Sequence, residues 1–423
     1  MKIHFVTFGC KANQYDTEKF RQELVARGAQ VVDDISSADT CVINTCTVTN
    51  QADAEARRAI RKIKRENPGI EIMVAGCSAA LHFDKYSAME QVRGVLKGHD
   101  PQQLVGLFSQ DELRSDVDEE PIGGALLRRD KRGTRAFMKI QDGCDRRCAF
   151  CATRLARGAS RSRRPEELIK EARGLAEHHP EIVLTGVHIG HYGYDIKEDG
   201  HKAHTLSKLV ARLIEEVPDV RWRLGSVEAT EIDDMMIDLL EQSGGRLVPH
   251  LHVPMQSGSD DVLRRMRRWH SREQYRSRML EIASRVPYLG FGADIIVGFP
   301  GEEERHHAET RALVEELPFT YLHVFPYSVR NDTLAATFKD QVPGDVAAER
   351  GRDLRQIAQS KGELYRAQRV GQAAEVVIEE GGYGLTEDYL RVRVDTELGD
   401  DELPVKVYAP LNMDSNGELF VVV

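Results

Sequence analysis

The sequence predicts an α/β protein in three parts: an N-terminal parallel α/β domain, a central (βα) barrel and a small C-terminal β-barrel. Apolar, strand-like runs alternate with helical runs from Met1 to about Lys97, and the same alternation recurs from Arg135 to about Ala336. From Val370 onward only short strand-like runs and Gly-rich turns remain. We therefore expect domains at residues 1–112, 130–365 and 368–423.

The N-terminal strands are expected in the runs IHFVTF, AQVVDD, DTCVIN and IEIMVAG. Helices are expected between them, around residues 16–26 and 52–65, because Gly28 and the triplet Asn67-Pro68-Gly69 end the two helical patterns. Strands that are joined through helices run parallel, so this domain is predicted to hold a mostly parallel sheet.

Residues 111–132 have no sustained period and carry first acids, then Gly, then bases, as is typical of a linker. Beyond them, the strand-like runs are AFMKI, EIVLTGV, RWRLGSV, HLHVPM, FGADIIVGF and YLHVFPY. Helical stretches separate them, among them residues 165–179, 205–217 and 272–286. This repetition predicts a closed or partial barrel. A helix at about 346–367 precedes the last strands, AAEVVIEE, YLRVRVD, VKVYAPL and GELFVVV.

Composition limits the class of protein. The chain holds 58 Lys and Arg against 68 Asp and Glu, a net charge of −10, so it is not a globally basic nucleic-acid binder and any RNA contact must come from local patches. The first residues lack the features of a signal peptide, and no segment approaches the length of an apolar membrane span, so we expect a cytoplasmic protein. Seven cysteines in such a chain indicate metal or redox chemistry rather than disulfides.

The strongest local signal is GCDRRCAFC, which places Cys144, Cys148 and Cys151 in one short loop after a predicted strand. Structural zinc requires four ligands, and no nearby His or Cys supplies the fourth, so zinc is the weaker interpretation. A [4Fe–4S] cluster held by three cysteines leaves one iron open for a substrate or cofactor. Four arginines around the loop would offset the negative charge of the cluster: Arg146, Arg147, Arg154 and Arg157.

Three further cysteines follow the ends of predicted strands: Cys10, Cys46 and Cys77. The carboxyl ends of parallel strands share one edge of a sheet, so these residues are expected to converge. Spacing alone leaves two interpretations open, a second three-cysteine cluster or three small buried side chains. Cys41 lies within a strand run instead of at its end and is predicted to serve packing.

Small and polar residues follow the other predicted barrel strands, where this architecture places its chemistry. Asp294 and Glu228 are candidates to bind hydroxyl or amino groups or to pair with an Arg, and His188 is expected to hydrogen-bond rather than to ligate a metal. Two basic stretches, RRDKRGTR and RGASRSRR, flank the CxxxCxxC loop and would attract a polyanion. Trp269, within RRMRRWH, is a candidate to stack on a base.

Together these motifs resemble those of the radical S-adenosylmethionine methylthiotransferases over almost the whole chain. GCDRRCAFC and RGASRSR are similar to that family's radical cluster loop. TFGCKANQYDTE, NTCTVTNQADAEARR, VAGC, LTGVHIGHYGYD, HLHVPMQSGSD, DIIVGFPGE and HVFPYS match the family in order. The forms of these motifs are most similar to the branch that acts on N6-threonylcarbamoyladenosine at position 37 of tRNA. Sister branches act on isopentenyladenosine in tRNA and on an aspartate of a ribosomal protein.

The resemblance implies two [4Fe–4S] clusters, an auxiliary one on Cys10, Cys46 and Cys77 and a radical one on Cys144, Cys148 and Cys151. It implies S-adenosylmethionine as the second cofactor, with these candidate contacts: Gly186, Ser226, Glu228, Gln256 and Asp294. The C-terminal strands resemble the family's TRAM domain. The implied partners are tRNA, a one-electron reductant protein of the flavodoxin or ferredoxin type and a sulfur donor, with no membrane.

The sequence departs from the family in its loops: Arg154 replaces a common Pro, Ser78-Ala79-Ala80 follows Cys77 where an aromatic is common, and Asn331-Asp332 interrupts the usual Arg-x-Gly-Thr. The C-terminal part is acidic, so electrostatics gives it no general affinity for RNA. Two alternatives remain beside the predicted methylthiolation of threonylcarbamoyladenosine. One is a sister-branch substrate, and the other is an RNA-binding protein whose cluster is structural.

Overall fold

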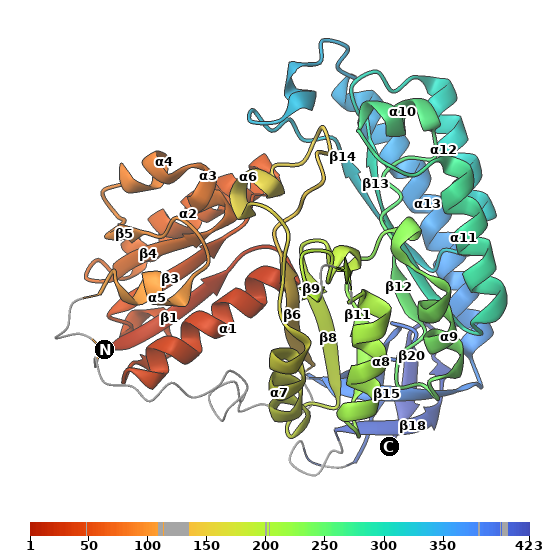
Figure 1. Cartoon of the computed structure of the whole chain (residues 1–423), viewed down its shortest axis with the longest axis horizontal. Coiled ribbons are helices and arrows are strands. Elements are labelled where there is room, and N and C mark those ends of the chain that lie inside the picture. The colour runs from red at the N-terminus through yellow and green to blue at the C-terminus, as the bar shows by residue number, and fades with distance from the viewer. Residues whose placement is uncertain are drawn as a thin grey trace. The chain divides into compact units, whose positions relative to one another are not determined.

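The computed structural model describes residues 1–47, 49–108, 113, 135–198, 201–202, 204–379, 381–397, 399 and 405–423 (Figure 1). The predicted linker at 111–132 lies outside the described residues apart from Leu113, and so does most of the basic run RRDKRGTR. The chain divides into two compact units. Unit 1 holds residues 1–128, 141–161 and 328–336, and unit 2 holds residues 129–140, 162–327 and 337–423. The CxxxCxxC loop thus belongs to the same unit as the N-terminal sheet.

Unit 1 is built on a five-stranded parallel sheet of order β2-β1-β3-β4-β5. The strands are β1 (Lys2–Thr7), β2 (Gln30–Val31), β3 (Thr40–Thr45), β4 (Glu71–Gly76) and β5 (Gly94–Val95). The helices are α1 (Lys11–Ala26), α2 (Asn50–Glu66), α3 (Cys77–Leu81), α4 (Phe83–Ser87), α5 (Pro101–Val105) and α6 (Thr153–Arg157), with a 3₁₀ turn at Ile35–Ser37. β2 is shorter than predicted because Asp34 accepts a hydrogen bond from the Ser36 N–H and starts that turn.

Helices cover both faces of this sheet. On one face, Phe20 and Leu24 of α1 and Leu104 of α5 pack with Val42 and Met73 of the sheet. On the other face, α2, α3 and α4 bury the side chains of Ile60, Ile63, Ala79 and Tyr86 against Cys41, Ile43, Ile72 and Val74. Cys41 therefore serves packing, as predicted. This arrangement explains why β3 is buried along its whole length and β4 at all but its first residue, since a parallel sheet with helices on both sides leaves neither face to water.

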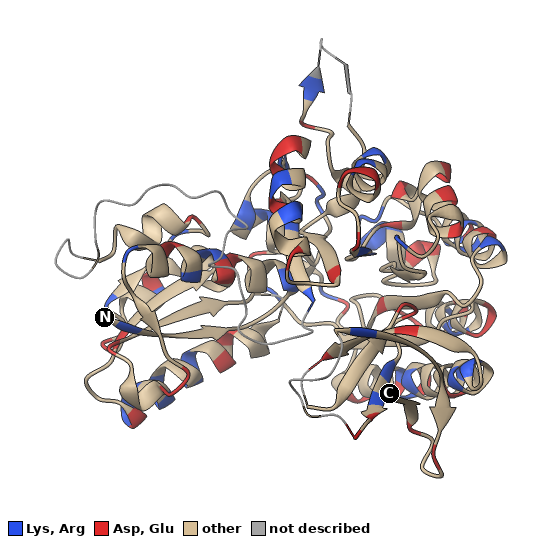
Figure 2. Ribbon diagram, turned by 90° about the horizontal axis from the view of Figure 1, so that it is seen from below, with Lys and Arg blue, Asp and Glu red and all other residues tan. Residues whose placement is uncertain are grey.

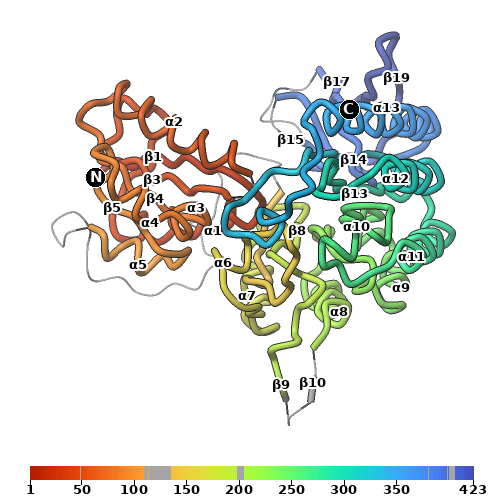
Figure 3. The backbone as a smooth tube through the Cα atoms, turned by 90° about the horizontal axis from the view of Figure 1, so that it is seen from above, coloured from red at the N-terminus to blue at the C-terminus, as the bar shows by residue number. Residues whose placement is uncertain are grey.

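Unit 2 begins with a partial barrel. Its strands form two sheets, β7-β6-β8-β11 and β12-β13-β14, joined by a parallel bridge between Ser226 and His252. The bounds are β6 (Ala136–Asp142), β7 (Arg161–Ser162), β8 (Glu181–Gly186), β11 (Arg221–Leu224), β12 (His250–His252), β13 (Gly290–Val297) and β14 (Tyr321–Pro326). β8 and β11 run parallel, as do β12, β13 and β14. A short antiparallel ribbon, β9 (Lys197–Glu198) and β10 (His201–Lys202), extends from this part of unit 2 (Figure 3).

Helices follow the barrel strands and lie on the outside, with α11, α12 and α13 side by side (Figures 1 and 3). They are α7 (Pro165–Ala176), α8 (Leu206–Glu216), α9 (Asp234–Gln242), α10 (Asp260–Arg265), α11 (Arg272–Arg285), α12 (Glu304–Glu316) and α13 (Gly344–Arg369), with 3₁₀ turns at Ile189–His191 and Ala229–Glu231. A further 3₁₀ turn, Leu334–Thr337, falls almost wholly within unit 1. Lys and Arg are interspersed with Asp and Glu on these helices (Figure 2). Among the described residues, no helix has the length and apolar character needed to cross a membrane.

The C-terminal strands curl into a six-stranded half-barrel of order β18-β15-β16-β17-β20-β19. They are β15 (Ala373–Glu379), β16 (Tyr383–Thr386), β17 (Arg391–Asp395), β18 (Lys406–Pro410), β19 (Asn412–Met413) and β20 (Leu419–Val422). Arg221 and Arg223 of β11 attach this sheet to the barrel, because their guanidinium groups donate to the carbonyls of Glu375, Leu385, Thr386 and Glu387. The predicted fold class, parallel α/β, partial barrel and small β domain, is confirmed.

Candidate metal centres and barrel mouth

The strand order of the unit 1 sheet contains a topological switch point. From β1 the chain proceeds to β2 on one side and then returns to β3 on the other, so α1 and α2 cover opposite faces. In open parallel sheets of this order, ligands bind outside the carboxyl ends of the two strands at the switch point. The residues that follow β1 and β3 therefore lie where this topology places a ligand.

Cysteines occupy these positions. Cys10 is the N-cap of α1 just after β1, and Cys46 directly follows β3. Cys77 is the first residue of α3, immediately after the neighbouring strand β4. The three thiols are close enough for Cys10 and Cys46 to raise the pKa of Cys77 electrostatically. The structure therefore brings together the three cysteines that the sequence places at strand ends.

Glycines make this convergence possible. Gly9 and Gly76 precede Cys10 and Cys77, and both have left-handed backbone angles, with φ of +101° and +97°. A β-carbon on Gly76 would lie 2.3 Å from the carbonyl oxygen of Thr45, and one on Gly9 would lie 2.7 Å from the Cys46 sulfur. Only glycine allows the strand ends to approach each other this closely.

The Cys77 sulfur lies in a buried polar environment. Burial raises the pKa of Cys77 to about 12, while the nearby Arg157 guanidinium lowers it in part. Arg157 Nε donates to the Cys77 sulfur at 3.2 Å, and His99 Nε2 lies 3.6 Å from the same sulfur. Arg157 was expected from the sequence to offset cluster charge, but its direct contact with Cys77 was not.

Asn13 is a residue of this site that the sequence did not single out. Its side-chain N–H groups donate to the carbonyls of Phe8 and Thr45, at the ends of β1 and β3. Its Oδ1 accepts from Arg157 at 2.6 Å. Asn44 Nδ2 donates to the backbone carbonyl of Asn13 and so helps to hold Asn13 in place. A buried amide that satisfies both strand ends holds the cysteine-bearing turns in register.

The CxxxCxxC loop is held closed by its own backbone. The N–H of Cys144 donates to the carbonyl of Gly158 at 3.0 Å, and the N–H of Cys151 donates to that of Cys148 at 3.2 Å. The Thr153 N–H lies 3.4 Å from the Cys151 sulfur. Cys144 and Cys148 are partly exposed and Cys151 is exposed, so this group opens to solvent more than the other one does.

Both groups have the chemistry of iron–sulfur ligands. Each offers three thiols outside any disulfide and an N–H donor to one of its sulfurs, and Cys10 also lies at the amino end of α1. Helix amino ends and N–H groups favour the negative charge of a thiolate-ligated cluster. The donor set at each group therefore fits a cluster with three protein ligands.

The residues predicted to contact S-adenosylmethionine lie at the mouth of the partial barrel in unit 2. Gly186 ends β8, Ser226 and Glu228 follow β11, and Asp294 lies in β13. Gln256 bridges to Ile295 of β13 and has a left-handed φ of +64°, a strained angle for a residue with a side chain. These residues lie on neighbouring strands of one partial barrel. Glu228 is ion-paired with Arg268.

Asp294 is the centre of a polar cluster that the sequence did not reveal. His252 Nε2 lies 3.1 Å and His323 Nδ1 lies 3.2 Å from Asp294 Oδ1. Burial alone would raise the pKa of Asp294, but the hydrogen bonds from both histidines outweigh it and hold that pKa well below its ordinary value. The Tyr321 hydroxyl lies 3.1 Å from the other nitrogen of His252 and so fixes its ring. Asp294 is therefore an ionised, oriented carboxylate at the barrel mouth.

His188 pairs with Glu231 at 2.8 Å, which agrees with the predicted hydrogen-bonding role. Its ring stacks on that of His191, which in turn stacks on Tyr194 with 4.0 Å between ring centroids. The Arg268 guanidinium lies over the Trp269 ring. Trp269 thus already has a cation on its indole.

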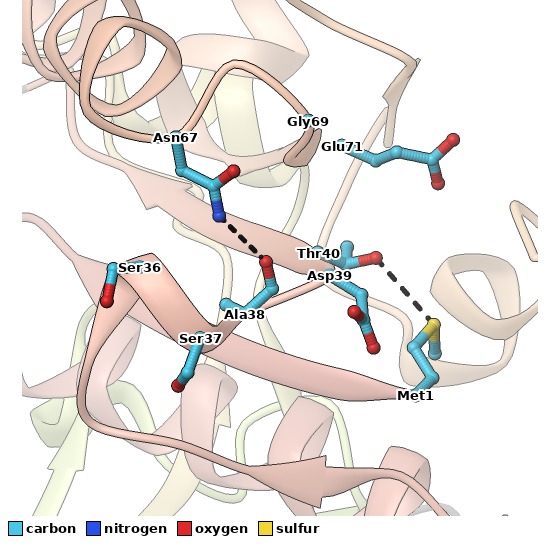
Figure 4. Close-up of a pocket in the computed structure, with 9 residues that line it drawn as sticks. All are labelled: Met1, Ser36, Ser37, Ala38, Asp39, Thr40, Asn67, Gly69 and Glu71. Atoms are coloured by element: carbon cyan, nitrogen blue, oxygen red, sulfur yellow. Dashed lines mark hydrogen bonds between the residues drawn. The ribbon is translucent and has the colours of Figure 1, made fainter.

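A hollow of about 710 Å³ lies at the opposite edge of the unit 1 sheet (Figure 4). It is lined by Met1, Ser36, Ser37, Ala38, Asp39, Thr40, Asn67, Gly69 and Glu71. Thr40 begins β3 and Cys46 follows its end, so the hollow is separated from the cysteines by the length of a strand, about 20 Å. This hollow is not part of the cysteine site.

Two family profiles match the chain. Residues 2–97 match the uncharacterized protein family UPF0004, and residues 138–314 match the radical SAM superfamily. Together the two profiles cover more than half of the chain.

Several curated proteins are similar to the chain over most of its length. The threonylcarbamoyladenosine tRNA methylthiotransferase MtaB of Bacillus subtilis (strain 168) is 38% identical, across 92% of this chain and 89% of that protein. The protein of the same name in Rickettsia prowazekii (strain Madrid E) is 34% identical, across 94% and 92%. The tRNA-2-methylthio-N(6)-dimethylallyladenosine synthase of Staphylococcus aureus (strain MRSA252) is 32% identical, across 88% and 74%.

Solved structures support the fold. The radical S-adenosylmethionine methyltransferase TsrM of Kitasatospora setae, with cobalamin and a [4Fe–4S] cluster bound, aligns with a TM-score of 0.56 at 14% identity. That alignment covers 77% of this chain and 74% of the other. The cobalamin-dependent S-adenosylmethionine radical enzyme OxsB aligns with a TM-score of 0.51 at 11% identity, over 84% of this chain and 56% of the other. At such identities the likeness concerns the fold alone.

Proposed function

Because the chain belongs to the radical S-adenosylmethionine methylthiotransferases, we propose that it converts N6-threonylcarbamoyladenosine, at position 37 of tRNA, to its 2-methylthio derivative. The observation that carries this proposal is the presence of two separate groups of three thiols within one compact unit. A reaction that adds both sulfur and a methyl group to an unactivated carbon needs more than one cofactor site. Relatives that act on threonylcarbamoyladenosine support the choice of substrate.

In this proposal Cys10, Cys46 and Cys77 hold the auxiliary cluster, and the loop cysteines hold the radical cluster: Cys144, Cys148 and Cys151. When bound, the clusters and S-adenosylmethionine supply the radical that activates the base and the methylthio group that it receives. The contribution of the protein is to hold the cysteine ligands in fixed positions. Asn13 fixes the two strand ends, and the Gly158 carbonyl closes the loop on Cys144.

S-Adenosylmethionine would lie at the barrel mouth, in contact with residues from neighbouring strands: Gly186, Ser226, Glu228, Gln256 and Asp294. The ionised Asp294 is suited to receive an amino or hydroxyl group, and its two histidines keep it charged and oriented. Orientation of this kind is the main contribution a protein makes to cofactor-driven chemistry. The radical must also be kept from water, and a barrel mouth walled by several strands favours that.

The functional domains would be residues 1–112 for the auxiliary cluster, 130–365 for the radical chemistry and 368–423 for a TRAM-like domain that contacts tRNA. The curled sheet of β15 to β20 supports the last assignment. A one-electron reductant protein of the flavodoxin or ferredoxin type and a sulfur donor complete the set of partners. Since tRNA is the substrate, we place the reaction in the cytoplasm.

The test is mass spectrometry of nucleosides from total tRNA of cells with and without the gene. Loss of the 2-methylthio form of threonylcarbamoyladenosine, with accumulation of its precursor, is the expected result. Loss of the 2-methylthio form of isopentenyladenosine instead would move the chain to the sister branch. Unchanged nucleosides, together with no 5′-deoxyadenosine from S-adenosylmethionine in vitro, would overturn the proposal.

A further inference from the structure

We propose that Arg157 is a positioning residue for the auxiliary cluster, which hydrogen-bonds the Cys77 sulfur and anchors the loop of the radical cluster beside it. This inference rests on the proposed function, since it assumes that Cys77 is a cluster ligand. It adds a residue that lies outside both sets of cysteines. It also gives one side chain a role at both metal centres.

Arg157 makes four hydrogen bonds through its guanidinium group. Nε donates to the Cys77 sulfur at 3.2 Å, Nη1 to Asp142 at 2.9 Å, and Nη2 both to Asn13 at 2.6 Å and to Asp16 at 2.9 Å. The side chain is only 2% exposed. A buried cation with four well-placed acceptors is held in one orientation, so the direction of its Nε–H towards sulfur is fixed.

The position of Arg157 in the chain connects the two sites. It is the last residue of α6, which begins two residues after Cys151. The next residue, Gly158, accepts the hydrogen bond that closes the loop on Cys144. The same short segment therefore shapes the CxxxCxxC loop at one point and reaches Cys77, the first residue of α3, at another.

The charges around Arg157 show what it contributes. One guanidinium faces two carboxylates, those of Asp16 and Asp142, which offset its positive charge. Arg157 is therefore not a surplus positive charge beside the cluster. Its distinct contribution is the N–H···S hydrogen bond, which stabilises the more negative, reduced state of a cluster and so raises its reduction potential.

A double variant can remove this hydrogen bond and keep the local net charge unchanged. Arg157→Met with Asp16→Asn removes one positive and one negative charge, so the local net charge does not change while the hydrogen bond to sulfur is lost. We expect a lower midpoint potential for the auxiliary cluster. Arg157→Lys keeps the cation, but one ammonium cannot serve all four acceptors, so a smaller shift in the same direction is expected.

The experiment is an anaerobic redox titration followed by electron paramagnetic resonance, in full-length chain that also carries Cys144→Ala, Cys148→Ala and Cys151→Ala. This background leaves the three auxiliary cysteines and Cys41, which is buried in the core. The matched control is Arg330→Met with Asp53→Asn. Arg330 is also buried in unit 1 and pairs with Asp53 at 2.9 Å, and none of its contacts among the described residues is with sulfur.

A lower potential with the Arg157 variants and an unchanged one with the Arg330 control would support the inference. Equal potentials in all variants, or equal shifts in the Arg157 and Arg330 variants, would overturn it. Loss of the cluster from the double variant alone, with unchanged circular dichroism, would also support it. If the double variant unfolds, the midpoint potential of the Arg157→Lys variant decides between these outcomes. If the background chain holds no cluster, the proposed function itself fails at its auxiliary site.

Discussion

Gly9 lies so close to Cys46 that a β-carbon on Gly9 would be 2.7 Å from both the β-carbon and the sulfur of that cysteine. Gly9 also has a φ of +101°, an angle that residues with side chains rarely adopt. Two independent constraints thus require glycine at the end of β1. The turn that presents Cys10 and the space that holds Cys46 are parts of one arrangement.

Gly9→Ala is expected to disturb that arrangement. The backbone strain costs about 1–2 kcal/mol, and the contact with Cys46 forces its sulfur to move. We expect a chain that folds with reduced stability and binds about half the iron of the parent after anaerobic reconstitution. Gly245→Ala is the control, because Gly245 has a φ of +82° and open space around its Cα. Equal iron loss in both variants would attribute the effect to strain alone.

Iron content also tests the two groups of cysteines. Two [4Fe–4S] clusters correspond to about eight irons per chain. Replacing Cys10, Cys46 and Cys77 by Ala should leave about four, and replacing the loop cysteines should leave about four with a different spectrum. Cys41→Ala is the control, since Cys41 packs in the core: it should cost about 1 kcal/mol of stability and no iron. Full iron content without the first three cysteines would contradict the assignment.

The convergence of the cysteines at the strand ends of unit 1 could be predicted because it depends on local sequence patterns. Apolar runs define β1, β3 and β4, and parallel strands necessarily share a carboxyl edge, so the cysteines after them had to approach one another. Cys41 was predictable for the same reason, since a residue in the middle of a buried strand has only the core to face. These inferences required no knowledge of distant contacts.

The contacts of Arg157 were not predictable in this way. Its partners Asn13 and Asp16 lie more than 140 residues away in the chain, and nothing in the local pattern RGASRSRR distinguishes this buried arginine from the exposed Arg161. The cluster of His252, Asp294 and His323 was missed for a related reason. It arises from the lateral register of three strands, which a sequence pattern does not fix.

Asp294→Asn is expected to weaken binding of S-adenosylmethionine by about 10- to 100-fold, because a charged hydrogen-bond acceptor contributes roughly 1.5–3 kcal/mol. Calorimetric titration of the reconstituted protein measures the change. Asp261→Asn is a matched control in the same unit, since Asp261 also accepts from a histidine and an arginine but at the surface. If both variants bind S-adenosylmethionine with equal affinity, Asp294 does not contact this cofactor, and its carboxylate would be available to the substrate instead.

Glu181 should make the stability of unit 2 depend on pH. Its fully buried carboxylate is 2.6 Å from Arg221 Nε and 2.8 Å from Arg223 Nε. Burial alone would raise the pKa of Glu181, but Arg223 and Arg221 outweigh it and lower that pKa to about 2. A lowered pKa stabilises the folded state above the ordinary value of 4.5, and this contribution is lost as the pH falls from 4.5 towards 2. The shift corresponds to about 3 kcal/mol.

Glu181→Gln tests this dependence. At pH 7 the substitution leaves the buried guanidinium of Arg223 without a counter-charge and that of Arg221 with Glu375 alone, so we expect a loss of about 3–5 kcal/mol in the free energy of unfolding. Urea unfolding of the metal-free chain, followed by the fluorescence of the buried Trp222 on the same strand as both arginines, gives the free energy at each pH. The difference between parent and variant should shrink below pH 4.5, because the Glu181 carboxylate of the unfolded parent then takes up a proton while that of the folded parent stays ionised down to about pH 2. A difference that stays constant down to pH 2 would show that Glu181 contributes through packing and not through its charge.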